Sequence, residues 1–124
     1  MIGGLTGAHI LLYSSDPEAD RAFFRDVLDL RSVDAGRGWL IFALPPSEAA
    51  LHPVEAAEDA PSGDLLRTDL YLMCDDVRAL VKTLESQQVT CSAIDEAPWG
   101  LRTAVRLPSG GEIGLYQPRH PTAI

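Results

Sequence analysis

Eight side chains of this sequence carry aromatic or hydrogen-bonding chemistry at positions that could bring them to one surface. They include all three tyrosines of the chain. A tyrosine offers apolar ring area and one polar hydroxyl, a combination typical of pockets for small molecules. We therefore expect the set to bind a small-molecule ligand, and the sequence assigns no catalytic residue within it. The set consists of His9, Tyr13, His52, Asp69, Tyr71, Trp99, Glu112 and Tyr116.

Part of this set has the composition of a metal site. His9, His52 and Glu112 form a two-histidine, one-carboxylate group of the kind that suits non-haem iron. His9 and Asp69 could instead act as an acid–base pair if they face each other across a cavity. One divalent metal ion therefore stays open as an alternative to a site with no cofactor.

Strand alternation predicts that these residues share one face, because successive side chains of a strand point to opposite sides. In the expected strand 68–74, Leu70 and Leu72 alternate with Asp69 and Tyr71. The same alternation separates aliphatic residues from His9 and Tyr13 in a strand at 7–14, from His52 in one at 48–52, and from Glu112 and Tyr116 in one at 112–117. We expect the aliphatic faces to cover two helices. The other faces either meet water or, as their tyrosines favour, form a concave binding surface.

An internal repeat orders these strands. The stretch AHILLYSSDPEADRAFF at 8–24 is echoed by TDLYLMCDDVRALVKTL at 68–84. Asp16 and Asp76 occupy matching places, where a carboxylate caps the first N–H groups of a helix, and Pro17 suits the first helical position. We expect two units with the element order β-α-β-β-β, in residues 1–55 and 67–124, joined by an acidic linker at 56–66 and forming one domain.

The expected elements follow this order in both units. The first unit has strands at 7–14, 31–35, 39–44 and 48–52, and the second at 68–74, 90–95, 101–107 and 112–117. Trp99 lies in the turn between Pro98 and Gly100, where it either covers the mouth of the cavity or plugs the edge of the core. The predicted fold class is α+β, with curled mixed sheets around a concave cavity.

Composition narrows the classes of partner. The net charge of −8 argues against nucleic acid, whose phosphates need a basic surface, and is compatible with a cationic ligand. Held between the tyrosines and the acidic groups, the ligand would be cationic or aromatic. No apolar run approaches the ~20 residues of a membrane span, and the first residues do not resemble a signal peptide. We expect a cytoplasmic protein that keeps Cys74 and Cys91 as free thiols.

The two ordered units resemble the vicinal oxygen chelate superfamily, which contains glyoxalases, extradiol dioxygenases, fosfomycin-resistance enzymes and bleomycin-resistance proteins. The resemblance covers essentially the whole chain and is most specific in HILLYSSDPEADRAFFRDVL at 9–28 and GGEIGLYQP at 110–118. It implies sheets that curl around a central cavity, which holds a divalent ion in the metalloenzymes of the group.

The resemblance also implies where metal ligands would stand. Carried over by position, they are His9, Ala50, Asp69 and Gly114, and neither Ala50 nor Gly114 has a side chain that can bind a metal. His52 and Glu112 each stand two residues away from such a position, roughly 6.6 Å along a strand. That distance exceeds a metal–ligand bond of about 2.0–2.2 Å.

Two functions follow from these observations. The first is a small-molecule-binding protein of the glyoxalase and bleomycin-resistance group without the complete metal site. The alternative is a metal-dependent lyase, isomerase or dioxygenase of the same superfamily that uses the rearranged set. In either case exposed sheet edges and the resemblance to this superfamily lead us to expect a homodimer.

Overall fold

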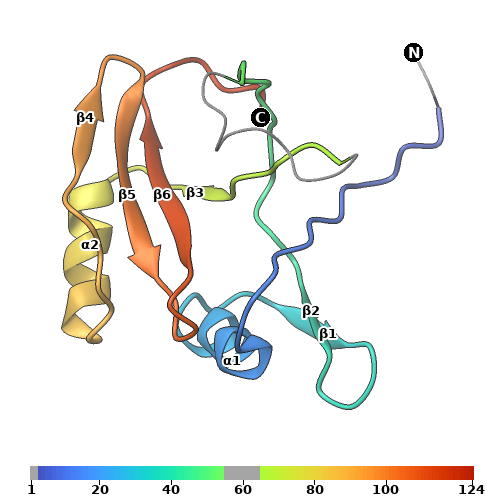
Figure 1. Cartoon of the computed structure of the whole chain (residues 1–124). Coiled ribbons are helices and arrows are strands. Elements are labelled where there is room, and N and C mark those ends of the chain that lie inside the picture. Colours follow the sequence, from blue (N-terminus) through green and yellow to red (C-terminus); the bar gives the residue numbers. More distant parts are fainter. Residues whose placement is uncertain (1–2, 55–64) are drawn as a thin grey trace.

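The computed structural model describes residues 3–54 and 65–124 of the chain, and it has the expected α+β class (Figure 1). The elements are α1 (Pro17–Asp26), β1 (Ser32–Asp34), β2 (Leu40–Phe42), β3 (Tyr71–Met73), α2 (Val77–Ser86), β4 (Asp95–Ala97), β5 (Gly100–Arg106) and β6 (Glu112–Pro118). Most of the expected linker falls outside the described residues. No described helix has the length and apolar content needed to cross a membrane.

The second unit forms a four-stranded mixed sheet with the strand order β3-β6-β5-β4. β3 pairs in parallel with β6, whereas the other neighbours are antiparallel. A parallel pair needs a crossover, and the chain from α2 through β5 supplies it. The second unit therefore has the element order β-α-β-β-β that the sequence predicts.

One face of this sheet packs against α2 and forms the hydrophobic core (Figure 1). The sheet contributes aliphatic residues that alternate along β5 and β6, and α2 contributes a matching apolar stripe. The buried residues of this layer are Val77, Val81, Leu84, Leu101, Val105, Ile113 and Leu115. The prediction that aliphatic strand faces cover a helix is confirmed for these strands.

Both helices begin where the internal repeat places them. The Asp16 carboxylate accepts a hydrogen bond from the Ala19 backbone N–H at 3.3 Å, and Asp76 does the same for Ala79 at 3.1 Å. Each aspartate satisfies one of the N–H groups that a helix leaves without an internal partner. The matching caps show that the repeat holds at the two helix starts.

Helix α1 joins the first unit to the second. Phe23 and Phe24 extend the core cluster, and the Phe24 ring meets Phe42 of β2 edge-on at 5.4 Å. The buried Asp20 carboxylate accepts hydrogen bonds from the Ser14 hydroxyl at 2.6 Å and from Ser109, through its hydroxyl at 2.6 Å and its N–H at 3.0 Å. Since Ser109 lies in the β5–β6 turn, Asp20 ties α1 to the tip of the larger sheet.

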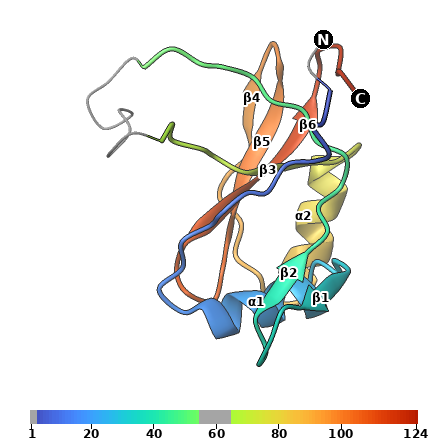
Figure 2. The same cartoon turned by 90° about the vertical axis from the view of Figure 1, so that its right-hand side faces the viewer.

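The first unit does not form the expected four-stranded sheet. Only β1 and β2 pair, and no strand forms at 7–14 or at 48–52, so those two predictions are wrong for the single chain. Both segments run as irregular chain (Figures 1 and 2). A strand exists only by hydrogen bonding to a neighbour, and residues 7–13 and 49–52 make no backbone hydrogen bond within the described chain.

Smaller boundary differences occur elsewhere. The expected strand 90–95 is reduced to a single bridge between Cys91 and Val105, and β4 begins only at Asp95. The paired strands of the first unit are also shorter than the apolar pattern suggested. Pattern identifies which residues favour a strand, whereas the ends depend on how far the neighbouring strand continues.

Candidate functional site

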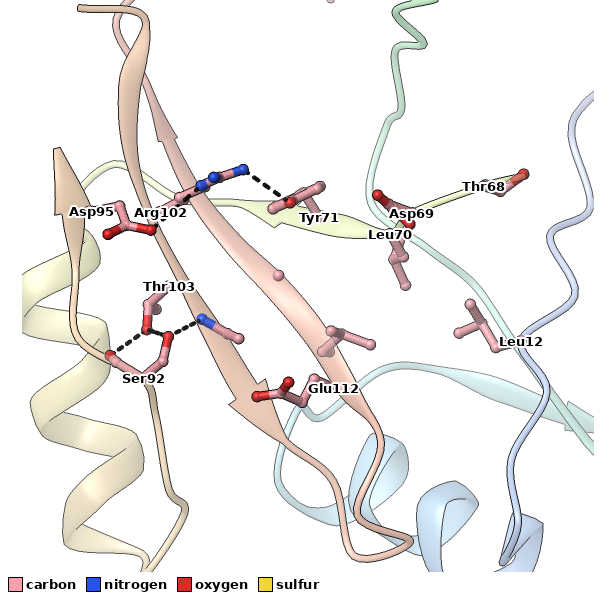
Figure 3. A pocket seen from close by; sticks show the side chains of 13 residues that line it. Leu12, Thr68, Asp69, Leu70, Tyr71, Ser92, Asp95, Arg102, Thr103 and Glu112 are labelled. Atoms are coloured by element: carbon pink, nitrogen blue, oxygen red, sulfur yellow. Dashed lines mark hydrogen bonds and ion pairs between the residues drawn. The ribbon is translucent and has the colours of Figure 1, made fainter. Parts of the chain in front are cut away.

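The face of the β3-β6-β5-β4 sheet turned away from α2 is open and carries the candidate site. An open hollow of about 400 Å³ lies on this face (Figure 3). It is lined by residues of all four strands, by residues just before β3 and β4, and by Leu12 of the N-terminal segment. Ala104 and Gly114, which are partners across β5 and β6, give it a floor of small residues. The alternation of the strands thus places a packed core on one side and a shallow recess on the other.

Four rings form a continuous aromatic cluster at one end of the open face. Tyr116 is central: its ring centroid lies 6.2 Å from Tyr71, 5.7 Å from Trp99 and 5.7 Å from His120. The Tyr116 hydroxyl donates to the Trp99 carbonyl oxygen at 2.8 Å, which holds both rings in place. Tyr71 and Trp99 remain 41% and 45% exposed, so the cluster offers ring surface to a ligand.

Glycines make room for two of these rings. A Cβ atom added to Gly114 would overlap the Tyr71 ring, and one added to Gly100 would come within 2.6 Å of the Tyr116 ring. Each tyrosine therefore lies over a glycine of a neighbouring strand. Gly114 is the position at which the resemblance placed a metal ligand, and the Tyr71 ring now occupies the space of its missing side chain.

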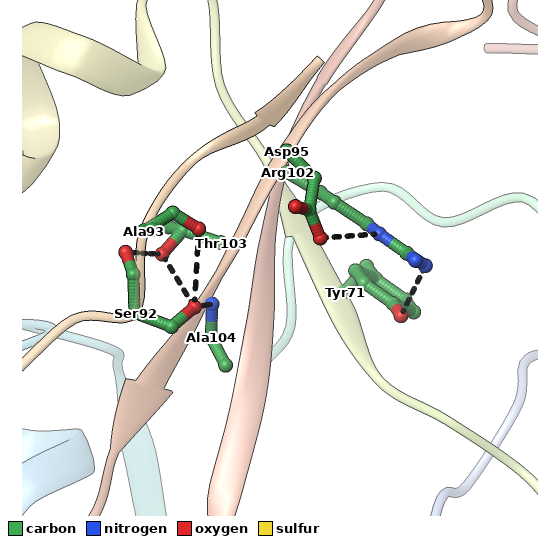
Figure 4. Close-up of polar contacts among 7 residues, drawn as sticks. All are labelled: Tyr71, Ser92, Ala93, Asp95, Arg102, Thr103 and Ala104. Carbon is green, nitrogen blue, oxygen red and sulfur yellow. Dashed lines mark hydrogen bonds and ion pairs between the residues drawn. The ribbon is translucent and has the colours of Figure 1, made fainter. Parts of the chain in front are cut away.

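Arg102 of β5 brings a positive charge to the same face (Figure 4). Its Nη1 donates to the Tyr71 hydroxyl at 3.4 Å, its Nε lies 3.8 Å from an Asp95 carboxylate oxygen, and its guanidinium carbon lies 5.4 Å from the Trp99 ring. The next residue, Thr103, points toward the core and donates to the Ser92 carbonyl oxygen at 2.6 Å. This bond fixes the chain that leads into β4.

The structure brings some of the predicted site residues together and leaves others apart. Asp69, Tyr71 and Glu112 line the hollow, and Tyr116 and Trp99 form the cluster beside it. His9, Tyr13 and His52 lie on the irregular segments of the first unit and are exposed, Tyr13 by 91%. Their part in binding stays a prediction. Trp99 lies beside Tyr116 with its ring partly exposed, and both alternatives for its role stay predictions.

Sequence reasoning missed Arg102 and His120. The signal for Arg102 was available, since alternation in the strand 101–107 separates it from Leu101 and Val105, both buried. His120 follows the last strand in a turn, and no periodicity marks such a position. Its stacking on Tyr116 depends on how the chain bends after Pro118, which only the three-dimensional structure shows.

The other groups with possible chemistry are poorly suited to it. Burial, together with the nearby Asp75, raises the pKa of the Cys74 thiol, and burial beside Glu85 raises that of Cys91. A raised pKa leaves less thiolate, which is the nucleophilic form. Both cysteines are free thiols, as expected. Burial, with Glu48 as a lesser cause, also raises the pKa of Tyr116, so its hydroxyl stays protonated and serves as a hydrogen-bond donor.

Comparison with protein families identifies the wider group. Residues 7–115 match the model of the glyoxalase/bleomycin resistance protein/dioxygenase superfamily. The chain belongs to this superfamily. None of the curated proteins compared with the chain is similar enough to count as a match.

Solved structures of the superfamily fold resemble the chain over most of its length. TnmS3, an antibiotic-binding protein from Streptomyces sp. CB03234, is 27% identical, with a TM-score of 0.61 over 93% of this chain and 99% of its own. A glyoxalase/bleomycin resistance protein from the same organism is 28% identical, with a TM-score of 0.55 over 84% and 93%. Lactoylglutathione lyase from Agrobacterium tumefaciens, at 19% identity and a TM-score of 0.64 over 94% and 96%, shows the shared fold.

The residues of this superfamily member do not fit the divalent ion that the fold implies. Among residues 3–54 and 65–124, no three histidine, cysteine, aspartate or glutamate side chains gather closely enough to hold a metal. Asp69 is instead paired with Arg67 at 3.2 Å. The place of a fourth ligand at Gly114 is filled by the Tyr71 ring. The donor set and the packing both disagree with the usual metal centre.

Proposed function

We propose that this superfamily member binds a small aromatic molecule on the open face of the β3-β6-β5-β4 sheet, with no metal ion taking part. The observation that carries the proposal is the uncovered cluster of Tyr71, Trp99, Tyr116 and His120 beside a hollow. Exposed rings held by one another and by glycines offer preorganised surfaces for stacking on a planar ligand. The aromatic cluster and the hollow together form the proposed site.

The similarity to TnmS3 supports a small-molecule ligand. That protein is described as antibiotic-binding and aligns with nearly all of the present chain at 27% identity. We propose that the present chain likewise holds an antibiotic-like compound and acts by sequestering it. That this compound is planar follows only from the ring cluster of the present chain. Sequestration requires only that the ligand bind tightly, so no catalytic group is needed at the site.

The metal-dependent alternative needs His9, His52 and Glu112 around one ion. His9 and His52 lie on two different irregular segments and Glu112 begins β6, so the described residues bring no observation in favour of that enzyme. A cytoplasmic location belongs to the proposal, and the free thiols of Cys74 and Cys91 support it.

We also propose that the functional form is a homodimer. The segments at 7–14 and 48–52 expose large apolar side chains, with Leu11 at 62% and Leu51 at 88%, and their backbones have no partner in the described chain. Strand pairing with a second copy would satisfy both, and the outer strands β3 and β4 offer free edges. Light scattering should give twice the mass of the chain. A monomer mass that does not change with concentration would contradict the dimer.

Calorimetric titration with a panel of planar aromatic antibiotics tests the binding function. We expect at least one compound to bind with the same affinity before and after treatment with a metal chelator. Tyr116→Ala should abolish binding because it removes the centre of the cluster, whereas Trp39→Ala removes an exposed ring elsewhere and should have no effect. Loss of binding on chelation, restored by zinc or iron, would overturn the proposal.

A further inference from the structure

We propose that Arg102 and Tyr71 form a paired-donor site for an acidic oxygen on the ligand, such as a phenolate or a carboxylate attached to a planar ring. This inference rests on the proposed aromatic binding and adds the chemical class of the ligand. It assigns recognition of the ring to the aromatic cluster and recognition of the oxygen to the two donors.

The two donors lie next to each other on the open face (Figures 3 and 4). The Tyr71 hydroxyl oxygen accepts from Arg102 Nη1 at 3.4 Å, so its own proton is available to an acceptor. The Tyr71 ring lies over Gly114 and cannot move toward the sheet, which fixes the height of the hydroxyl above it. A ligand oxygen placed next to both the Tyr71 hydroxyl and the Arg102 guanidinium would receive one hydrogen bond from each.

Arg102 has donors left for a ligand. Its guanidinium carries five N–H groups, and charge-assisted bonds from it to a carboxylate are normally about 2.7–2.9 Å long. The contact between Nε and Asp95 is 3.8 Å and the contact with Tyr71 is 3.4 Å, so both are loose. The Arg102 side chain is 44% exposed. Arg102 therefore makes no short charge-assisted hydrogen bond within the described chain, and its N–H groups remain available to a ligand.

The ring cluster points a stacked ligand toward these donors. The Arg102 guanidinium lies 5.4 Å from the centre of the Trp99 ring, which is itself 5.7 Å from Tyr116. A planar molecule on Trp99 or Tyr116 would thus have its edge near Arg102. A guanidinium flanked by aromatic rings binds planar oxygen groups well because it is weakly hydrated and rigid.

The local charges moderate this preference. Asp69, Asp95 and Glu112 also line the hollow, and Arg102 is the one basic residue among the described residues that line it. Asp69 is neutralised by Arg67 at 3.2 Å, and Glu112 begins β6 at the opposite end from Tyr116. Asp95 is the carboxylate that competes most directly for Arg102. We therefore expect a modest preference for the ionised ligand, about tenfold.

The test uses 7-hydroxycoumarin, a planar probe whose phenol ionises near neutral pH with a change in absorbance, and 7-methoxycoumarin, which cannot ionise. On the wild-type protein the pKa of the bound phenol should fall by about one unit, which corresponds to tenfold tighter binding of the phenolate. Arg102→Gln should remove the shift, and Tyr71→Phe, which keeps the ring, should reduce it. Asp95→Asn should enlarge the shift. Arg106→Gln is the control, because it removes an arginine at the other end of β5. This variant should leave the pKa shift of the bound phenol unchanged.

The outcomes separate the two proposals. If both coumarins bind and the phenol keeps its solution pKa, or if Arg106→Gln lowers the shift as much as Arg102→Gln, the paired-donor site is overturned while aromatic binding stands. If neither probe binds the wild-type protein, the aromatic-binding function fails and this inference fails with it.

Discussion

The two faces of the β3-β6-β5-β4 sheet alternate along the same strands but are built in opposite ways. On the side of α2, Val105 has no exposed surface and Leu115 only 3%, and both pack among aliphatic neighbours. On the other side, Tyr71 and Tyr116 lie over glycines, and Arg102 has only loose contacts. The face packed on α2 provides most of the buried apolar surface that stabilises the fold. The open face holds its tyrosines and Arg102 in position but leaves them accessible.

Truncated side chains should have different consequences on the two faces. A truncation on the packed face leaves a cavity that the surrounding structure fills only partly. A truncation on the open face removes ring surface that water already reaches. Mutations on the two faces should therefore affect stability and binding in opposite proportions.

Leu115→Ala should have the largest effect on stability. Because Leu115 is buried in the layer between β6 and α2, we expect a loss of about 2–5 kcal/mol in the free energy of unfolding, measured in urea. The protein that remains folded should keep its affinity for an aromatic probe. A loss below about 1 kcal/mol would mean that the α2 side is not the principal core.

Asp20→Asn tests the buried carboxylate that joins α1 to the β5–β6 turn. Burial alone would raise the pKa of Asp20, but the hydrogen bonds from Ser109 and Ser14 outweigh it and hold the pKa below the usual value of 3.8. Hydrogen bonds to a charged group contribute roughly 1.5–3 kcal/mol, so at pH 7 the variant should be less stable by about that amount.

The same variant has a defined pH signature. Because the folded-state pKa is lowered, the contribution of Asp20 is fully present above the unfolded pKa and is lost as the pH falls through the folded pKa. The difference in stability between wild type and Asp20→Asn should therefore be constant above about pH 5 and shrink steadily toward pH 2. A constant difference across this range would show that the hydrogen bonds do not favour the ionised form.

Gly114→Ala tests the close contact on the open face. The added methyl group must displace the Tyr71 ring, and overpacking of this kind costs typically about 1–3 kcal/mol. Binding of an aromatic probe should weaken more than stability does, because the ring that moves belongs to the proposed site. The double variant Gly114→Ala, Tyr71→Ala should recover the lost stability but not the binding.

Tyr71→Ala should have the smallest effect on stability. Tyr71 is 41% exposed, and its ring meets Tyr116 edge-on, a contact worth about 0.5–1.5 kcal/mol. Binding of 7-hydroxycoumarin should nevertheless fall at least tenfold. If Tyr71→Ala destabilises the fold as much as Leu115→Ala, the tyrosine is a core residue and the two faces do not differ as described.

Sequence reasoning reached the second unit more fully than the first. Alternation in β6 correctly separated Leu115 from Tyr116, because β6 is paired on both sides, with β3 and with β5. The same reasoning failed at His9 and His52, whose segments have suitable patterns but no pairing partner within the described chain. A pattern states which residues a strand would bury, whereas its formation depends on a neighbouring edge that the pattern does not contain.

In the candidate site, too, strand alternation predicted some features and could not predict others. Asp69, Tyr71, Glu112 and Tyr116 could be placed on one face from spacing alone. The fit of the Tyr71 ring over Gly114 could not, since Tyr71 and Gly114 lie 43 positions apart and meet only through the parallel register of β3 and β6. Stacking of His120 on Tyr116 was equally out of reach, because irregular chain carries no period.

Fluorescence of Trp99 tests the central claim, that the open face binds an aromatic molecule, most directly. The chain has two tryptophans, so Trp39→Phe leaves Trp99 as the sole reporter and Trp99→Phe leaves Trp39. Titration with 7-methoxycoumarin should quench Trp99 saturably in the first variant, because the ligand stacks within its ring cluster, and should leave Trp39 without a saturable change in the second. Equal responses from both tryptophans, or no saturable change at Trp99, would contradict the assignment of the open face as the binding site.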